Sequence, residues 1–144
     1  MNARGFTLIE LLVVMVVLGL VMAVAPLALF ERMPGAETKA AARELGAAMR
    51  ALRSESIRHN QPLALTVDLQ ARQWSAPSRP ARSFPKTAEI GLIIAANEIP
   101  DDGVGRVTFY PDGTTSGGTI TLSQGERRYH VAVDWLTGQV DVGE

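Results

Sequence analysis

The feature that most constrains this chain is an uncharged apolar stretch close to its N-terminus. Residues 11–30 contain no Asp, Glu, Lys or Arg, and this length suits a helix that crosses the hydrocarbon core of a bilayer. The charges that precede it are those of Arg4 and Glu10. A carboxylate among apolar residues of a membrane helix is costly, so Glu10 is a functional candidate that needs a partner.

The position of a small residue separates this stretch from a secretory signal peptide. Such a signal has a shorter apolar core, followed by a small-residue cleavage site. Here Gly5 lies before the apolar stretch, so cleavage at that point would keep the helix in the mature chain. The alternative is an ordinary signal anchor whose Glu10 side chain reaches toward the membrane interface.

The run Gly5-Phe6-Thr7-Leu8-Ile9-Glu10, followed by an apolar helix, resembles the class III signal of type IV pilins and type II secretion pseudopilins. The resemblance implies a leader, residues 1–5, that a prepilin peptidase removes by cutting between Gly5 and Phe6 before it methylates the Phe6 amine. It also implies that residues 6–30 form the transmembrane and assembly helix, with Glu10 serving subunit assembly. The amine and the carboxylate of neighbouring subunits can neutralise each other where the dielectric constant is low.

Composition limits the rest of the chain to one modest domain. The 144 residues include 14 Lys and Arg against 15 Asp and Glu, a near balance that does not suggest a polyanion-binding protein. Cysteine is absent, which excludes a disulfide, a thiolate nucleophile and a cysteine-ligated metal.

Residues 31–61 are predicted to form an amphipathic periplasmic helix. Pro26 predicts a bend or a locally unwound turn before it, and at Met33-Pro34-Gly35 the helix either restarts or bends again. Asn60, followed closely by Pro62, is a stop signal. An apolar stripe recurs at helical spacing and is expected to pack on the head: Ala41, Leu45, Ala48, Met49, Leu52 and Ser56.

Residues 62–144 are predicted to form a β-rich globular head. Residues 77–86, with three prolines, are expected to be a loop, and residues 88–95 are apolar enough for a buried strand. The predicted fold class is α+β and type IV pilin-like, a long N-terminal helix on an antiparallel sheet or two-sheet sandwich. The predicted strands are 63–69, 73–75, 88–95, 106–110, 119–123, 128–135 and 139–142.

A second resemblance lies in the C-terminal half. Phe109-Tyr110-Pro111-Asp112-Gly113, Ser116-Gly117-Gly118 and the segment from Val131 to Val140 are similar to the GspH family of minor pseudopilins, which is grouped with FimT-like minor pilins. This implies a structural subunit, not an enzyme, near the tip of the periplasmic type II secretion pseudopilus that helps to export folded proteins across the outer membrane.

The same resemblance implies where the protein resides and what it contacts. The precursor would be a single-pass protein of the bacterial inner membrane, with its head in the periplasm, and would later be extracted into the pseudopilus. Its partners would be other pseudopilins, both major shaft and minor tip subunits, together with the prepilin peptidase that also methylates it.

Patterns for catalysis or cofactor binding are weak. The glycine-rich segment 112–118 lacks the lysine of a phosphate-binding loop, and His59 and His130 have no partner at metal-ligand spacing. Asp101, Asp102 and Asp112 could supply oxygen ligands to calcium, but aspartate beside glycine is common in turns for backbone reasons. We expect neither a cofactor nor a metal.

A basic stretch carries the alternative function. Arg72, Arg79, Arg82 and Lys86 have no acidic residue between them, and Trp74 and Phe84 lie nearby for base stacking. These residues would suit a FimT-like minor type IV pilin that binds DNA during uptake. A solvated loop is the favoured interpretation, so nucleic acid is not an expected partner of the pseudopilin.

Overall fold

The computed structural model describes residues 7–30, 35–77, 79–94 and 103–144, with the side chains of these residues apart from 23–30. Its contacts divide the chain into two compact units, residues 1–34 and 35–144.

The first unit contains a single described helix. Helix α1 (Leu8–Phe30) is 23 residues long and continues through Pro26. Its described side chains, from Leu8 to Met22, are all exposed. In the part of the chain that the structure describes, no helix has both the length and the apolar character that a membrane crossing requires.

The second unit begins with a new helix. Helix α2 (Ala36–His59) follows Gly35, whose left-handed backbone (φ 95°) sets the direction of its first turn. The helix ends at Asn60 (φ 50°), where the Asn60 and Gln61 amides donate to the Ile57 and Ser56 carbonyls at 3.3 and 3.2 Å. The alternative in which the helix restarts after Pro34 is therefore confirmed, as is the stop at Asn60.

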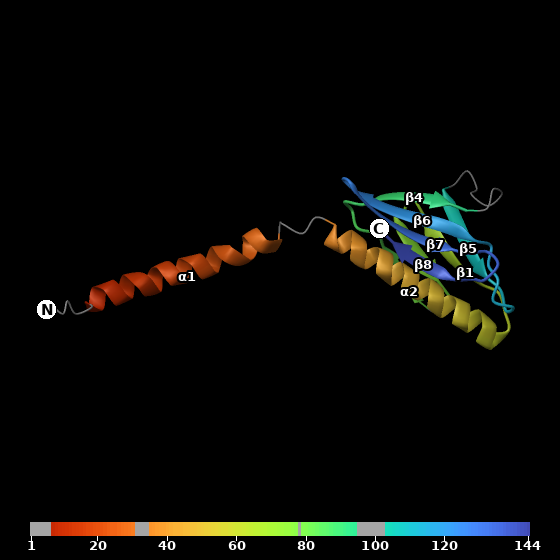
Figure 1. Ribbon diagram of the computed structural model, residues 1–144, viewed down its shortest axis with the longest axis horizontal. Coiled ribbons are helices and arrows are strands. Elements are labelled where there is room, and N and C mark those ends of the chain that lie inside the picture. The colour runs from red at the N-terminus through yellow and green to blue at the C-terminus, as the bar shows by residue number, and fades with distance from the viewer. Residues whose placement is uncertain (1–6, 31–34, 78, 95–102) are drawn as a thin grey trace. The chain divides into compact units, whose positions relative to one another are not determined.

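The rest of the second unit forms two antiparallel four-stranded sheets (Figure 1). The first has the strand order β3-β2-β1-β5 and the second the order β4-β6-β7-β8. The strands are β1 (Leu63–Asp68), β2 (Gln73–Ala76), β3 (Arg79–Ser83), β4 (Glu89–Ile93), β5 (Val104–Phe109), β6 (Gly118–Gln124), β7 (Arg127–Val133) and β8 (Val140–Gly143).

Helix α2 runs along the sheets and contacts strands of both (Figure 1): β1 and β5 of the first, and β6, β7 and β8 of the second. Of the predicted stripe, Leu45, Ala48, Met49, Leu52 and Ser56 are buried and Ala41 is half-buried. The helix also buries residues that the prediction missed: Thr38, Ala42 and Gly46. Every residue of the described hydrophobic core lies in this second unit.

Two predictions about the strands are wrong. Residues 77–86 are not a loop throughout, because β3 lies within them and pairs with β2. Its side chains are all exposed, so it has no alternation of apolar and polar residues that a sequence pattern could reveal. The predicted buried strand 88–95 is instead the edge strand β4, on which Ile93 is 69% exposed while Ile90 and Leu92 pack against the core.

One close approach fixes the distance between α2 and β8. A Cβ atom added at Gly46 would lie 2.4 Å from Cγ2 of Val142, closer than two carbon atoms can pack. Because Val142 has a stiff, β-branched side chain, it cannot simply swing away. Glycine at this position therefore lets the helix lie directly on the strand.

We predict that Gly46→Ala lowers the free energy of unfolding of the 35–144 fragment, which contains the whole described core. Overpacking costs about 1–3 kcal/mol, which exceeds the gain of about 1 kcal/mol in helix propensity. Urea denaturation measures the change.

Val142→Ala provides the matched control, since it removes the methyl group that the added Cβ atom would meet. The double variant should lose less stability than the sum of the two single variants. Additive losses would show that this contact does not set the helix–sheet distance.

Candidate functional site

The predicted cleavage and methylation site, Gly5 and Phe6, lies outside the described residues, so its geometry remains a prediction. Glu10 lies in the first turn of α1 and its side chain is exposed. The backbone amide of Thr7 donates toward Glu10 Oε2 at 3.5 Å, and the Thr7 carbonyl accepts from the amides of Glu10 and Leu11 at 3.1 and 3.3 Å.

This arrangement is half of a capping box. In the pattern Thr-x-x-Glu, the acidic side chain turns back and accepts a hydrogen bond from the backbone amide at the start of the helix. A negative charge at this position also interacts favourably with the positive end of the helix dipole. Glu10 thus has a partner within its own helix, which sequence analysis missed although Thr7 and Glu10 stand at the diagnostic spacing. The partner of Glu10 was instead expected on another subunit, as the resemblance to pilins implies.

Two turns in the C-terminal half of the chain are each built on an aspartate. Asp112 Oδ1 accepts from the amide and the hydroxyl of Thr114 at 2.9 and 2.6 Å. Asp134 Oδ1 accepts from the Leu136 amide at 3.1 Å and from the amide and hydroxyl of Thr137 at 2.7 and 2.8 Å. The aspartate in the Asp112 turn therefore serves the backbone, as expected for aspartate beside glycine.

These hydrogen bonds stabilise the ionised form of both carboxyl groups. The Thr114 hydroxyl, then the Thr114 amide, hold the pKa of Asp112 below its ordinary value. For Asp134 the Thr137 amide contributes most, followed by the Thr137 hydroxyl, and its pKa is also lowered. Both turns are therefore most stable when their aspartates are charged.

One arginine of α2 holds the two turns together. Arg53 donates from Nε to the Gly113 carbonyl at 3.3 Å and from Nη2 to the Thr137 carbonyl at 2.8 Å. The turns also touch directly, because a Cβ atom at Gly138 would lie 2.2 Å from the Gly113 oxygen. We call this arrangement the Arg53 clasp: Arg53, Gly113, Thr137 and Gly138. No local sequence signal marks it, since its partners are 60 and 84 residues away.

The basic stretch of the DNA-binding alternative is largely engaged within the fold. Arg79 and Arg82 form ion pairs with Glu55 and Glu44 of α2 at 3.5 and 3.2 Å. Arg72 donates to the Pro85 and Ala88 carbonyls. The aromatic residues named for base stacking, Trp74 and Phe84, are buried in the core at 4% and 3% exposure. Three of the four basic residues therefore contact other parts of the chain, although the side chains of Arg79 and Arg82 remain 39% and 59% exposed.

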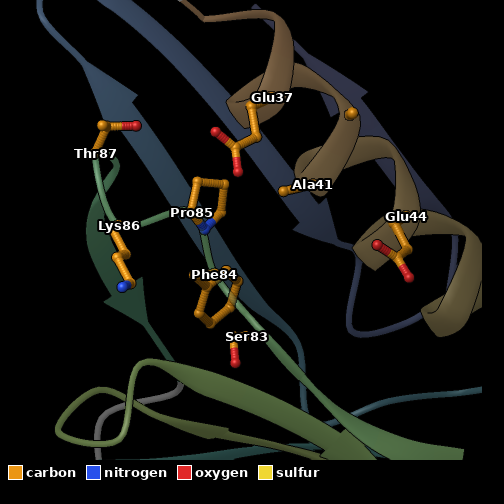
Figure 2. A pocket seen from close by; sticks show the side chains of 9 residues that line it. Glu37, Ala41, Glu44, Ser83, Phe84, Pro85, Lys86 and Thr87 are labelled. Atoms are coloured by element: carbon orange, nitrogen blue, oxygen red, sulfur yellow. The ribbon is translucent and has the colours of Figure 1, made fainter.

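A groove of about 550 Å³ lies between the N-terminal half of α2 and the segment that follows β3. Figure 2 shows Glu37 and Glu44 of α2 on one side of this groove and Phe84, Pro85 and Lys86 on the other. Glu44, which lines this groove, also forms an ion pair with Arg82 of β3 at 3.2 Å.

The histidines occupy separate places. His59 is the last residue of α2, and His130 lies on β7 with Nε2 3.9 Å from Asp141 Oδ2. Within the residues that the structure describes, no three His, Cys, Asp or Glu side chains are grouped as they would be around a metal ion.

We predict that acid weakens the Asp134 turn. Because its pKa is lowered in the folded state, the stabilisation is present above the ordinary aspartate pKa of about 3.9 and disappears as the pH falls through the lower folded value. In urea denaturation of the 35–144 fragment, Asp134→Asn should therefore flatten the loss of stability below about pH 4. Parallel pH profiles for the two proteins would contradict this account.

Comparison with known proteins gives two family matches. Residues 41–138 match the family described as type II transport protein GspH, and residues 1–26 match the prokaryotic N-terminal methylation motif. Over 140 residues the chain is 30% identical to the type II secretion system protein H of Xanthomonas campestris pv. campestris, an alignment that covers 97% of this chain and 83% of that protein.

Solved structures of low identity share the fold. The minor pseudopilin EpsH of Vibrio cholerae superposes with a TM-score of 0.59 at 13% identity, covering 74% of this chain and 96% of that one. The type IV minor pilin FimU of Pseudomonas aeruginosa superposes with a TM-score of 0.53 at 15% identity, covering 73% and 87%. The fold therefore occurs both in a minor pseudopilin and in a type IV minor pilin. The predicted type IV pilin-like α+β class is confirmed, and the chain belongs to the GspH family of type II transport proteins.

Proposed function

We propose that this protein is a minor pseudopilin, a structural subunit near the tip of the type II secretion pseudopilus, which helps to export folded proteins across the outer membrane. The observation that carries the proposal is the presence in one chain of an N-terminal methylation motif and a GspH segment of 98 residues, 41–138. The Xanthomonas relative, which bears the name of a type II secretion protein and aligns along nearly the whole chain, supports it.

In this proposal the N-terminal segment and the rest of the chain have separate tasks. Residues 1–5 are a leader that prepilin peptidase removes and residues 6–30 anchor the chain in the inner membrane, while residues 31–61 and 62–144 lie in the periplasm. The support for the anchor is the uncharged run of 20 residues from Leu11 to Phe30 together with the motif. The partners are other pseudopilins, and the protein acts by assembly, not by catalysis.

Glu10 is the residue that would govern assembly. Its carboxylate is held near the Thr7 amide in the isolated chain. When subunits assemble, the methylated amine of Phe6 on a neighbour supplies a full positive charge, and in a low-dielectric helix bundle that pair is stronger than a contact to a neutral amide. On assembly, the Glu10 carboxylate thus exchanges the Thr7 amide of its own chain for the Phe6 amine of a neighbouring subunit.

We predict that Gly5→Leu blocks processing, because the peptidase would have to accept a branched side chain where glycine leaves the backbone open. Mass spectrometry of the purified chain should show the full precursor without methylation. Gly19→Leu is the matched control, since space around Gly19 is open, and this variant should be cleaved normally. A mature chain of normal mass from Gly5→Leu would contradict the prediction and show that processing does not require glycine at position 5.

Two substitutions at Glu10 separate charge pairing from helix capping. Glu10→Ala removes both, whereas Glu10→Gln retains an acceptor for the Thr7 amide and removes only the charge. We predict that both variants are processed and inserted, yet fail to copurify with the other pseudopilins and fail to support exoprotein release.

Normal incorporation of Glu10→Gln would show that capping is sufficient and that the charge is not needed. Normal incorporation of both variants, with secretion intact, would remove Glu10 from the assembly mechanism altogether.

A further inference from the structure

Helix α2 separates its charges onto two flanks of its buried face. Glu37, Glu44 and Glu55 are spaced by 7 and 11 residues, which is about two and three helical turns, and so lie along one flank. Two of them are neutralised by Arg82 and Arg79 of β3. The opposite flank is basic and lies beside β8; its residues are Lys39, Arg43, Arg50 and Arg53.

The basic flank is not neutralised in the same way. At its N-terminal end Lys39 pairs with Glu144 at 3.2 Å. Across the described ranges, however, neither Arg43 nor Arg50 nor Arg53 lies within ion-pair distance of a carboxylate. In a chain whose charges nearly balance overall, these guanidinium groups form a local excess of positive charge.

A pocket of about 420 Å³ lies at the centre of this excess. It is lined by Arg50, Arg53 and Ser54 of α2 and by residues 137–140, and none of these lining residues is acidic. Hydrogen bonds orient both arginines: Arg50 Nη2 donates to the Val140 carbonyl at 3.1 Å, and Arg53 is held in the Arg53 clasp. The guanidinium groups of Arg50 and Arg53 therefore both line this pocket in fixed orientations.

These contacts leave donors available. A guanidinium carries five N–H groups, and the hydrogen bonds to backbone carbonyls engage the Nη2 group of Arg50 and the Nε and Nη2 groups of Arg53. A planar fork of donors matches the two oxygens of a carboxylate. Because both side chains are already held by backbone carbonyls, ordering them around a ligand would cost little conformational entropy.

We propose that this pocket binds an aspartate or glutamate side chain of a neighbouring pseudopilin. The inference rests on the proposed function, because a filament is what brings another subunit against α2. A protein carboxylate fits the observations because the pocket opens on an exposed face of the helix beside Ser54, where a second chain can reach it. Arg50 and Arg53 then act as a docking point for an acidic side chain.

The test uses the full chain in secreting cells, with the photoreactive residue p-benzoylphenylalanine at position 54. A second chain carries it at Val13 of α1 and reports filament incorporation independently of the pocket. We expect an adduct from position 54 to another pseudopilin, mapped by mass spectrometry to a peptide that contains an aspartate or glutamate.

Arg50→Glu should lower the yield of this adduct about tenfold, equivalent to about 1.4 kcal/mol. Arg50→Gln should lower it less, while keeping a donor for the Val140 carbonyl and guarding against a loss that merely reflects misfolding. Arg58→Glu, an equal change of charge at an exposed position of α2 outside the pocket, is the matched control and should leave the yield unchanged.

Replacing the mapped acidic residue of the partner by lysine should restore the adduct of Arg50→Glu. The proposal is overturned if position 54 gives no adduct while Val13 does, if Arg50→Glu leaves the yield unchanged, or if the partner's lysine does not rescue it. If p-benzoylphenylalanine at position 13 of the otherwise unsubstituted chain gives no adduct to another pseudopilin, the proposed function itself is overturned.

Discussion

The contact between α2 and the strands of both sheets is the interaction on which the rest of the second unit depends. Leu45, Met49 and Leu52 of α2 are completely buried. At about 25 cal/mol per Å², burying a side chain of this size is worth roughly 1.5–3 kcal/mol, so three such residues outweigh the exposed ion pairs along the same helix, worth about 0–1 kcal/mol each. Apolar burial therefore holds α2 on the sheets. The charged residues on its flanks are not needed for this attachment and are available for contacts with other subunits.

Hydrogen bonds from α2 side chains to specific backbone carbonyls fix the orientation of the buried helix on the sheets. Arg53 reaches the two aspartate-based turns, Arg50 reaches β8, and Ser56 donates to the Tyr110 carbonyl at 3.2 Å. Each accepting carbonyl belongs to a turn or a strand end at which regular pairing stops. The helix thereby fixes strand ends in both sheets, and it links the GspH-like segments 109–113 and 131–140 into one structural unit.

Sequence patterns predicted those parts of the fold that depend on local periodicity. The stripe on α2 repeats every three or four residues, and β1 alternates between buried and half-buried residues, so both were visible in the sequence. Strand β3 was missed because it has no buried residue, and the burial of β4 was overestimated because strand order, which places it at an edge, is not encoded locally. The Arg53 clasp and the position of the basic flank beside β8 depend on long-range contacts and could be found only in the structure.

At the N-terminus, magnitudes decide what the internal contact of Glu10 can achieve. A carboxylate at the start of a helix gains about 0.3–1 kcal/mol from the helix dipole, whereas a charge at the centre of a membrane helix costs about 2.5–3.5 kcal/mol on insertion scales and less near an end. In the proposed membrane position, the contact of Glu10 with the Thr7 amide can therefore offset this cost only in part, because a hydrogen bond of 3.5 Å is weak. In the proposed assembly, the positively charged amine of a neighbouring subunit would supply the remainder, and this is the physical reason to propose that Glu10 pairs with it.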